Sequence, residues 1–491
     1  MKVKETLGKS ACLITLYLLY AVWLIYNISF ITPMADDWRC AAAPYHNDGT
    51  WYRVRPFTFG NPFWRPFEGL LGYFLGENPF LFPYLNQGLV VIGHLLLMVL
   101  LYNGLKRYTG NNNAALGATA IFALSPATVG TTSQMDAINQ CWTLLCGVIA
   151  TKLFIKGNYY GKKKYIMFYL FFAMCAVLFK ENGICWFLVP VFLCIINDYI
   201  SGENRIWHLL KGYREKIVLG IVGSIAYFVI RFSLQGSISL GGGGRYAVQV
   251  SVIDIIKNNI IIFGSSMTTI DSLAVFMKPN SWGIIVITTI VTILSWKYLI
   301  EAIIKLKREY NLMPIILLFL VAIFVNLPLT IMPHVSEMSA YQSVFVFAFF
   351  VGIVWKYIRI NKWSKFTLGM LLICMLSVST HKFMVTQAYA ENVRIGKQQY
   401  QDCFINIPRT VLIFYVDDVP LEYSTYMQPL GHGLEQGRAF RSDWNWMDLD
   451  KNGKIIYCKS VDEIDYEINN YDEYDTVFIQ YQSGRVVLLR N

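Results

Sequence analysis

Apolar runs of membrane-spanning length recur along most of this 491-residue chain. A helix needs about 20 mostly apolar residues to cross the roughly 30 Å hydrocarbon core of a bilayer. The chain is 55% hydrophobic and only 15% charged, whereas soluble domains carry about 25% charged residues. The sequence therefore predicts a mainly α, polytopic membrane protein and excludes an ordinary soluble enzyme.

The apolar runs divide into about eleven predicted transmembrane helices, which cover residues 11–31, 84–102, 114–129, 138–155, 165–179, 184–196, 217–232, 283–300, 312–330, 340–357 and 366–385. With the N-terminus in the cytoplasm, the short basic turns fall together on the cytoplasmic side, as membrane proteins prefer. The net charge of +10 comes largely from these turns, so it gives no reason to expect a nucleic-acid partner. We expect a multi-pass protein of the cell membrane with a cytoplasmic N-terminus and long outer loops at 32–83 and 233–282.

The tail at 386–491 is polar and contains two strand-like runs, TVLIFYV and DTVFIQY, set apart by turn residues. Runs of this kind predict a small α/β domain, and the topology places it outside the cell. We therefore divide the chain into a transmembrane domain at 1–385 and a small extracytoplasmic α/β domain at 386–491. Cys403 and Cys458 lie in this tail and could form a disulfide. No cysteine–histidine spacing typical of zinc occurs, so no metal or cofactor is expected.

Two adjacent carboxylates, Asp36 and Asp37, follow the first apolar run within the segment ITPMADDWR. A general base must lie within hydrogen-bond reach of the hydroxyl that it deprotonates. Two neighbouring carboxylates disfavour each other's charge, which helps one of them to take up a proton. The pair is therefore our candidate catalytic centre. The alternative is a solvated loop start or a helix N-cap, a position that acidic residues often occupy.

Further ionisable residues gather on the predicted outer side, and such groups near membrane depth are candidates for function. They are Arg65, Glu68, Asp136, Lys180, Glu181, Arg245, His334 and Glu337. Arginine and lysine side chains can hold an anionic leaving group such as a phosphate. Lys180 and Glu181 are also interpretable as an ion pair that stabilises a turn, and His334 as a structural residue. The segment GGGGRY at 241–246 is more typical of a hinge than of a phosphate-binding loop.

Several short motifs occur in an order typical of one family of membrane enzymes. An acidic pair follows the first span, an Arg-Pro pair precedes an Asn-Pro-Phe motif, a Lys-Glu pair follows span five, and a Glu…Tyr motif opens a late span. The matching residues after the acidic pair are Arg65, Pro66, Asn78, Pro79, Phe80, Asn86, His94, Pro126, Lys180, Glu181, Glu337 and Tyr341. Over residues 10–360 or so, this order resembles the polytopic GT-C glycosyltransferases. The similarity is greatest to the protein O-mannosyltransferase-like branch, including the transmembrane O-mannosyltransferases with TPR repeats.

The resemblance implies a polyprenyl-phosphate sugar as donor and an acidic residue of the first outer loop as catalytic base. On this chain it implies Asp36 or Asp37 as the base, with Asp136, Glu181 and Glu337 as supporting acids. Contacts to the donor phosphate fall on Arg65, Lys180 and Arg245. The chain departs from the family pattern at Met338, where the late motif usually has arginine, and it has no TPR repeats.

These features predict an inverting, membrane-embedded glycosyltransferase that acts on an extracytoplasmic protein, glycan or lipid acceptor. The alternative is a transporter or flippase for a lipid-linked sugar. Transporters place their ionisable groups near the bilayer midplane, often in two related halves, whereas here these groups gather at one face. A third interpretation is a membrane scaffold that presents the tail domain.

Overall fold

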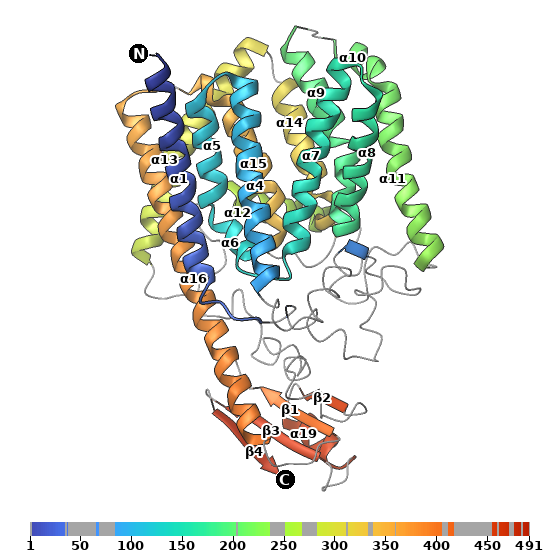
Figure 1. The fold of residues 1–491 in the computed structure, drawn as a ribbon, viewed down its shortest axis with the longest axis vertical. Coiled ribbons are helices and arrows are strands. Elements are labelled where there is room, and N and C mark those ends of the chain that lie inside the picture. The colour runs from blue at the N-terminus through green and yellow to red at the C-terminus, as the bar shows by residue number, and fades with distance from the viewer. Residues whose placement is uncertain are drawn as a thin grey trace.

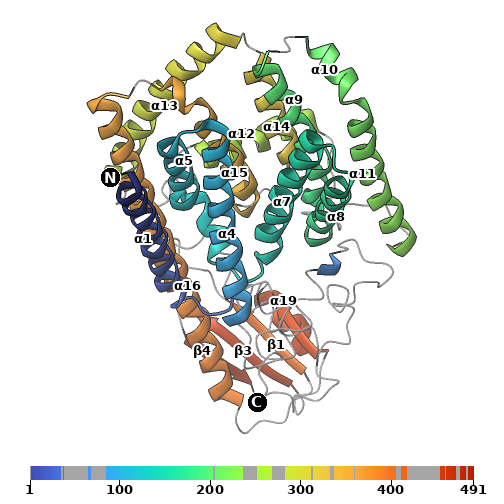
Figure 2. The same ribbon diagram turned by 45° about the horizontal axis from the view of Figure 1, so that its top comes forward.

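The computed structural model of the chain describes residues 2–34, 37, 65–67, 84–202, 205–235, 251–267, 282–310, 313–331, 337–358, 360–404, 411–416, 454–458, 461–470, 476–482 and 485–490. Within these residues, helices stand side by side and form a bundle, and a small β-sheet lies beyond one end of it (Figure 1). The two parts are joined by α16, which continues from the bundle to the sheet (Figures 1 and 2).

The bundle contains long apolar helices and shorter connecting segments. The long elements are α1 (Lys2–Ile28), α4 (Tyr84–Thr109), α5 (Asn112–Leu124), α7 (Ile138–Tyr160), α8 (Lys163–Phe179), α9 (Val189–Ile200), α11 (Arg214–Gln235), α12 (Val252–Met267), α13 (Trp282–Tyr310), α14 (Met313–Thr330), α15 (Tyr341–Val354) and α16 (Lys362–Phe404). The short elements are η3 (Pro126–Thr128), α6 (Val129–Thr132), η4 (Glu181–Phe187), α10 (Ile206–Gly212), η7 (Glu337–Ala340) and η8 (Trp355–Tyr357).

Seven helices in the described part of the chain are long and apolar enough to cross a membrane, or eight if the bent pair of α5 with η3–α6 forms one span. The segments 13–28 and 338–354 are apolar but shorter. This agrees with a polytopic, mainly helical membrane protein. Each of the predicted spans overlaps a helix of the structure, whereas the count of eleven stays a prediction.

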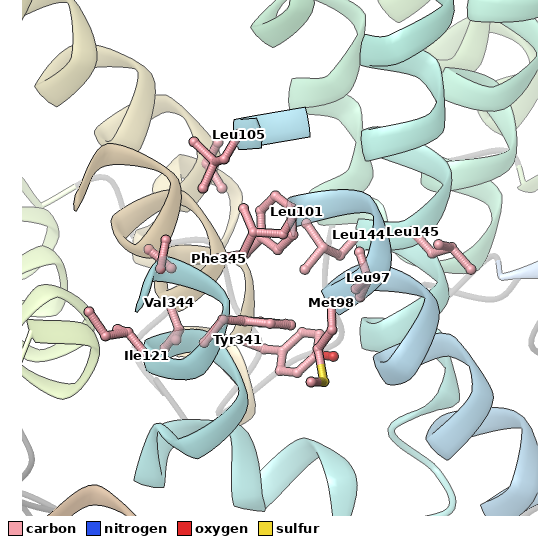
Figure 3. Close-up of a cluster of buried hydrophobic side chains, with 14 of the residues drawn as sticks. Leu97, Met98, Leu101, Leu105, Ile121, Leu144, Leu145, Tyr341, Val344 and Phe345 are labelled. Atoms are coloured by element: carbon pink, nitrogen blue, oxygen red, sulfur yellow. The ribbon is translucent and has the colours of Figure 1, made fainter. Parts of the chain in front are cut away.

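The core of the bundle lies where α4, α5, α7 and α15 meet (Figure 3). Leu97 and Leu101 from α4 pack with Ile121 from α5 and with Tyr341 and Phe345 from α15. Leu97 and Tyr341 have no exposed surface. Close packing of large apolar side chains fixes how the four helices lie against one another.

The chain bends by 54° between α5 and the segment η3–α6. Pro126 lies at this break, and proline cannot continue a helical hydrogen-bond ladder. Carbonyl groups at the break are satisfied by α16: the Ser379 hydroxyl donates to Leu124 O at 2.9 Å, and the buried Lys382 ammonium donates to Pro126 O at 2.8 Å. Side chains of α16 therefore stabilise the bend.

The predicted span at 184–196 differs from the structure at its start. The chain forms a 3₁₀ segment, η4, up to Phe187, and the α-helix α9 begins only at Val189. Gly183 explains the tight geometry, because a Cβ atom there would lie 2.4 Å from the backbone carbonyl of Ala176 in α8. The turn after α8 is thus wound closely against that helix.

The tail contains a four-stranded sheet with the order β2-β1-β3-β4. Its strands are β1 (Val411–Val416), β2 (Lys454–Cys458), β3 (Thr476–Gln482) and β4 (Arg485–Arg490), with helix α19 (Val461–Ile468) between β2 and β3. Strand β1 is parallel to β2 and β3, and β4 is antiparallel to β3. Helix α16 runs through the predicted domain boundary at residue 385 without a break, so the division into two domains stays a prediction.

Candidate functional site

The predicted site residues that the structure describes lie at the end of the bundle nearer to the sheet (Figure 1). Asp37 follows α1, Asp136 lies in the turn between α6 and α7, and Glu181 begins η4. Chain segments far apart in sequence are therefore brought to one end, as the predicted topology requires.

Asp37 is held by backbone groups from two segments of the chain. Its side chain is buried, with 2% exposed. Its Oδ1 accepts a 2.7 Å hydrogen bond from the backbone N–H of Asp136, and its Oδ2 accepts a 3.1 Å bond from the backbone N–H of Met34. The carboxylate therefore joins the end of the first helix to the turn before α7. The Met34 contact is local and resembles capping, whereas the Asp136 contact crosses 99 residues.

Other predicted site residues lie outside the described residues or lack a described side chain. Asp36, Glu68, Arg245 with its segment 241–246, and His334 belong to the first group. Glu337 begins the 3₁₀ segment η7, but its side chain is not described. The roles suggested for these residues stay predictions.

Arg65 and Glu181 form a largely buried ion pair between the first outer loop and the turn after α8. The Arg65 Nε lies 3.1 Å from Oε1 and 3.0 Å from Oε2 of Glu181. The side chains are 11% and 5% exposed, respectively. Buried charges are tolerated when they are paired, so this contact places a fixed arginine next to the Lys180–Glu181 motif. The structure thus brings Arg65 and Glu181 together, and the ion-pair partner of Glu181 is Arg65.

A second buried arginine, Arg231 on α11, lies near this pair and was missed in the sequence analysis. Arg231 is 1% exposed, and its Nη1 donates to the hydroxyl of Tyr227 at 3.0 Å. The hydroxyl of Tyr227 is within electrostatic range of Glu181, Arg231 and Arg65. A single arginine inside the apolar run 217–232 is the signal that would have identified it, because a charge within a span is rare without a function.

Three cationic residues of the described part of the chain lie near Glu181, and the carboxylates of Asp37 and Asp136 lie at the same end of the bundle. Arg65, Arg231 and Lys180 are three cations, and Glu181 is the carboxylate that Arg65 contacts. Lys180 lies at the end of α8, next to Glu181. Cationic side chains that are fixed in place can stabilise a phosphate group in a partly dehydrated site.

His94 and Tyr341, two of the motif residues, meet inside the bundle core rather than at its end. The Tyr20 hydroxyl donates to Ala123 O at 2.9 Å, so its oxygen accepts from His94 Nε2 at 2.9 Å. The other ring nitrogen, Nδ1, then accepts from the Tyr341 hydroxyl at 2.7 Å. A neutral imidazole with the proton on Nε2 satisfies all three contacts. This chain of hydrogen bonds ties α1, α4, α5 and α15 together, which is a structural role.

Within the described residues, no group of three or more histidine, cysteine, aspartate or glutamate side chains could hold a metal ion. The tail cysteine Cys458 is a buried free thiol.

No protein-family model and no curated protein matches the chain. Among solved structures, the chain is similar to ArnT from Cupriavidus metallidurans, which was solved bound to undecaprenyl phosphate. The similarity has a TM-score of 0.50 at 11% sequence identity, and it covers 95% of this chain and 92% of the ArnT chain. At this identity the similarity concerns the fold, which extends over nearly the whole of both chains.

Proposed function

We propose that the protein is an integral-membrane glycosyltransferase of the GT-C type that takes a sugar from a polyprenyl-phosphate donor. The observation that carries this proposal is the fold, which is shared over 95% of the chain with a protein solved bound to undecaprenyl phosphate. The cation cluster around Glu181 provides a chemically suitable place for a lipid phosphate. Asp37, the described member of the acidic pair after α1, lies at the same end of the bundle.

In the proposed reaction, a carboxylate of the pair Asp36–Asp37 removes the proton from an acceptor hydroxyl. The hydroxyl oxygen then attacks the anomeric carbon of the sugar, and the bond from that carbon to the phosphate oxygen breaks. The polyprenyl phosphate leaves with the bonding electrons. Because the attack and the departure occur on opposite faces of the sugar, the anomeric configuration inverts.

Arg65, Arg231 and Lys180 are the proposed contacts to the departing phosphate, with Arg245 as a further contact from the second outer loop. Charge that develops on the leaving oxygen is stabilised best by cations already fixed in place. The ion pair with Glu181 fixes Arg65 in this way. Asp136 and Glu337 are proposed supporting acids, and Asp136 also holds Asp37 through its backbone N–H.

The test is transfer of a radiolabelled sugar from a panel of polyprenyl-phosphate donors by the purified protein in lipid nanodiscs. We expect label to appear on an acceptor with one donor of the panel. If no donor reacts, but the protein in liposomes carries a lipid-linked sugar across the bilayer, the transporter interpretation replaces this one.

The acidic pair is tested with Asp36→Asn and Asp37→Asn, using Asp462→Asn on α19 as the control. Loss of a general base lowers the rate by about 10²–10⁴-fold, so we expect one of the two variants to show a loss of that size. Asp37→Asn also removes one of the two acceptors for backbone N–H groups, so its melting temperature must be measured beside its activity. Full activity in both variants at normal expression would refute the role of the pair.

A further inference from the structure

A large apolar cavity lies at the other end of the bundle, away from the sheet. Its volume is about 1230 Å³, and α4, α7, α9, α13, α14 and α15 line it. Pockets for drug-sized ligands span about 300–1,000 Å³. The cavity is thus large enough for a molecule with long apolar chains. Trp186 in η4, Phe319 and Phe350 belong to its walls.

Four cations lie among the residues that line this cavity. They are Lys106 and Arg107, near the end of α4, and Lys152 and Lys156, toward the end of α7. Among its described lining residues no aspartate or glutamate occurs. Lys152 and Lys156 are four residues apart on one helix, a spacing at which like charges destabilise the helix. An anion between the cations would relieve this repulsion.

We call the part of the lining formed by the last turns of α4, α7 and α9 the cavity mouth, and hydrogen bonds fix one side of it. The Tyr159 hydroxyl donates to Asp198 Oδ1 at 3.0 Å, and the Asn197 amide donates to the Tyr159 oxygen at 2.6 Å. Both Tyr159 and Asn197 line the cavity. The other oxygen of Asp198 accepts a 2.7 Å bond from Tyr213, which lies between α10 and α11. The mouth is therefore built from residues that contact one another, and the carboxylate of Asp198 is occupied by tyrosine hydroxyls.

We propose that this cavity binds an anionic phospholipid of the bilayer leaflet at that end. Its acyl chains would occupy the apolar space, and its phosphate would lie among Lys106, Arg107, Lys152 and Lys156. The charge of the mouth selects an anionic over a zwitterionic head group, since each lysine or arginine near the surface attracts anionic lipid. The cations of this cavity are distant from the proposed donor site: Lys106 is 22 residues, or about 33 Å along the helix, beyond Tyr84, where α4 begins at the end of the bundle nearer to the sheet.

The test compares two triple variants of the full-length protein, both with three lysines replaced at the same end of the bundle. The first is K106Q/K152Q/K156Q in the cavity mouth. The matched control is K162Q/K163Q/K164Q, whose lysines are exposed and do not line the cavity. Phosphatidylglycerol and phosphatidylcholine are titrated onto each delipidated protein, and bound lipid is counted by native mass spectrometry.

We expect the mouth variant to bind phosphatidylglycerol about a hundredfold more weakly than the wild type. The control should remain near the wild-type affinity, and phosphatidylcholine should bind weakly to all three. Equal losses in both variants would mean that the surface charge alone attracts the lipid, which would overturn the proposal. Unchanged binding in the mouth variant would overturn it as well.

A second variant tests the apolar part without changing any charge. Leu193→Trp adds bulk to a residue that lines the cavity, so phosphatidylglycerol binding should weaken while the melting temperature of the lipid-free protein stays near the wild-type value. Binding at the wild-type level in a folded Leu193→Trp protein would contradict the proposed position of the acyl chains. A competition with undecaprenyl phosphate completes the test. If undecaprenyl phosphate displaces bound phosphatidylglycerol at a concentration below that at which phosphatidylglycerol binds, the occupant of the cavity is the carrier lipid, and our assignment is refuted.

Discussion

Glu181 is the residue whose surroundings say most about the candidate site. Its carboxylate is 5% exposed and meets the Nε of Arg65 with both oxygens. The two residues are 116 positions apart in the sequence, so their contact fixes the first outer loop against the turn after α8. A buried charge that loses its partner is strongly destabilising, which makes this pair both a structural link and a part of the proposed phosphate site.

A double-mutant cycle on this pair has a definite expected outcome. Arg65→Met removes the arginine from the buried carboxylate of Glu181, and Glu181→Leu removes the carboxylate from the buried guanidinium of Arg65. Each variant should therefore lower the free energy of unfolding by about 3–5 kcal/mol. The double variant should lose less than the sum of the two. Chemical unfolding in detergent measures all three. Additive losses would contradict a direct interaction.

The exposed pair Glu391–Arg394 on α16 is the control for this cycle. Its side chains lie 2.6 Å apart but are about half exposed, at 49% and 53%. Exposed ion pairs contribute little to stability. The same substitutions there should leave the unfolding curve unchanged.

Cys458 allows a prediction of pH dependence in the tail. Burial raises the pKa of its thiol from 9.0 to about 11, and the carboxylates of Glu463 and Glu467 act in the same direction. Because the thiolate is the reactive form, alkylation by iodoacetamide at pH 8 should be about a hundredfold slower in the folded protein than after unfolding. The rate should rise about tenfold per pH unit until the pH approaches the raised pKa. Peptide mass spectrometry follows the modification, and equal folded and unfolded rates would contradict the burial of this thiol.

At the scale of the elements, η4 is the segment that connects the candidate site to the wall of the large cavity. Glu181 at its start pairs with Arg65, and Trp186 near its end lines the large cavity. Gly147 on α7 makes room for Trp186, since a Cβ atom there would lie 2.1 Å from the indole ring. A 3₁₀ segment whose Gly183 packs against the backbone of α8, and whose own indole packs against Gly147 of α7, has little freedom to move.

Gly183→Ala should therefore damage this element. Its Cβ would meet the backbone of Ala176 at 2.4 Å, and backbone atoms cannot rotate away as a side chain can. Overpacking of this kind costs about 1–3 kcal/mol. Gly88→Ala on α4 is the control, because a Cβ there meets nothing within 4 Å, and alanine favours a helix over glycine by about 1 kcal/mol. Thermal unfolding should show opposite signs for the two variants, and a stabilised Gly183→Ala protein would show that the turn is looser than described.

The elements also show what the sequence could and could not predict. Long apolar runs predicted the helices because lipid permits few other structures, and the runs TVLIFYV and DTVFIQY coincide with β1 and β3. The parallel pairing of β1 with both β2 and β3 depends on contacts between distant segments, which local patterns do not contain. The 3₁₀ start of the predicted span at 184–196 also escaped, because apolar residues follow one another in either kind of helix.

The site was predictable to a similar extent. Asp37, Asp136, Arg65 and Glu181 stood out as charges beside apolar runs, and the topology correctly gathered them at one end. Their pairing was not predictable: Asp37 contacts the backbone of Asp136, and Glu181 pairs with Arg65, which is 116 positions away in the sequence. Arg231 was missed because a single charge inside an apolar run hardly changes the average hydropathy of that run.

At the scale of the whole molecule, the predicted topology places the two ends of the bundle on opposite sides of the membrane. The sheet lies beyond one end, and the turn between α7 and α8 lies at the other (Figures 1 and 2). Lys163→Cys and Asp462→Cys report on these two ends, because both native residues are exposed. Cys12, Cys40 and Cys403 are replaced by serine in this background, and the seven cysteines with described side chains are buried.

A membrane-impermeant maleimide should label Asp462→Cys from the outside of intact cells and Lys163→Cys only in inverted membrane vesicles. Labelling of the two positions from the same side would contradict the predicted topology. That result would also mean that the sheet and the end of the bundle that carries Asp37 and Glu181 lie on opposite sides of the membrane.

Helix α16 has a consequence for how far the tail can reach. It is 43 residues long, or about 64 Å, which is roughly twice the thickness of a hydrocarbon core. Side chains brace it against the first helix and the segment that follows: Gln387 donates to Asn27 O at 2.6 Å, and Thr32 donates to Ala390 O at 3.0 Å. The helix therefore continues beyond the bundle without a break, and the distance from the braced part of α16 to its end at Phe404 is set by a number of helical turns.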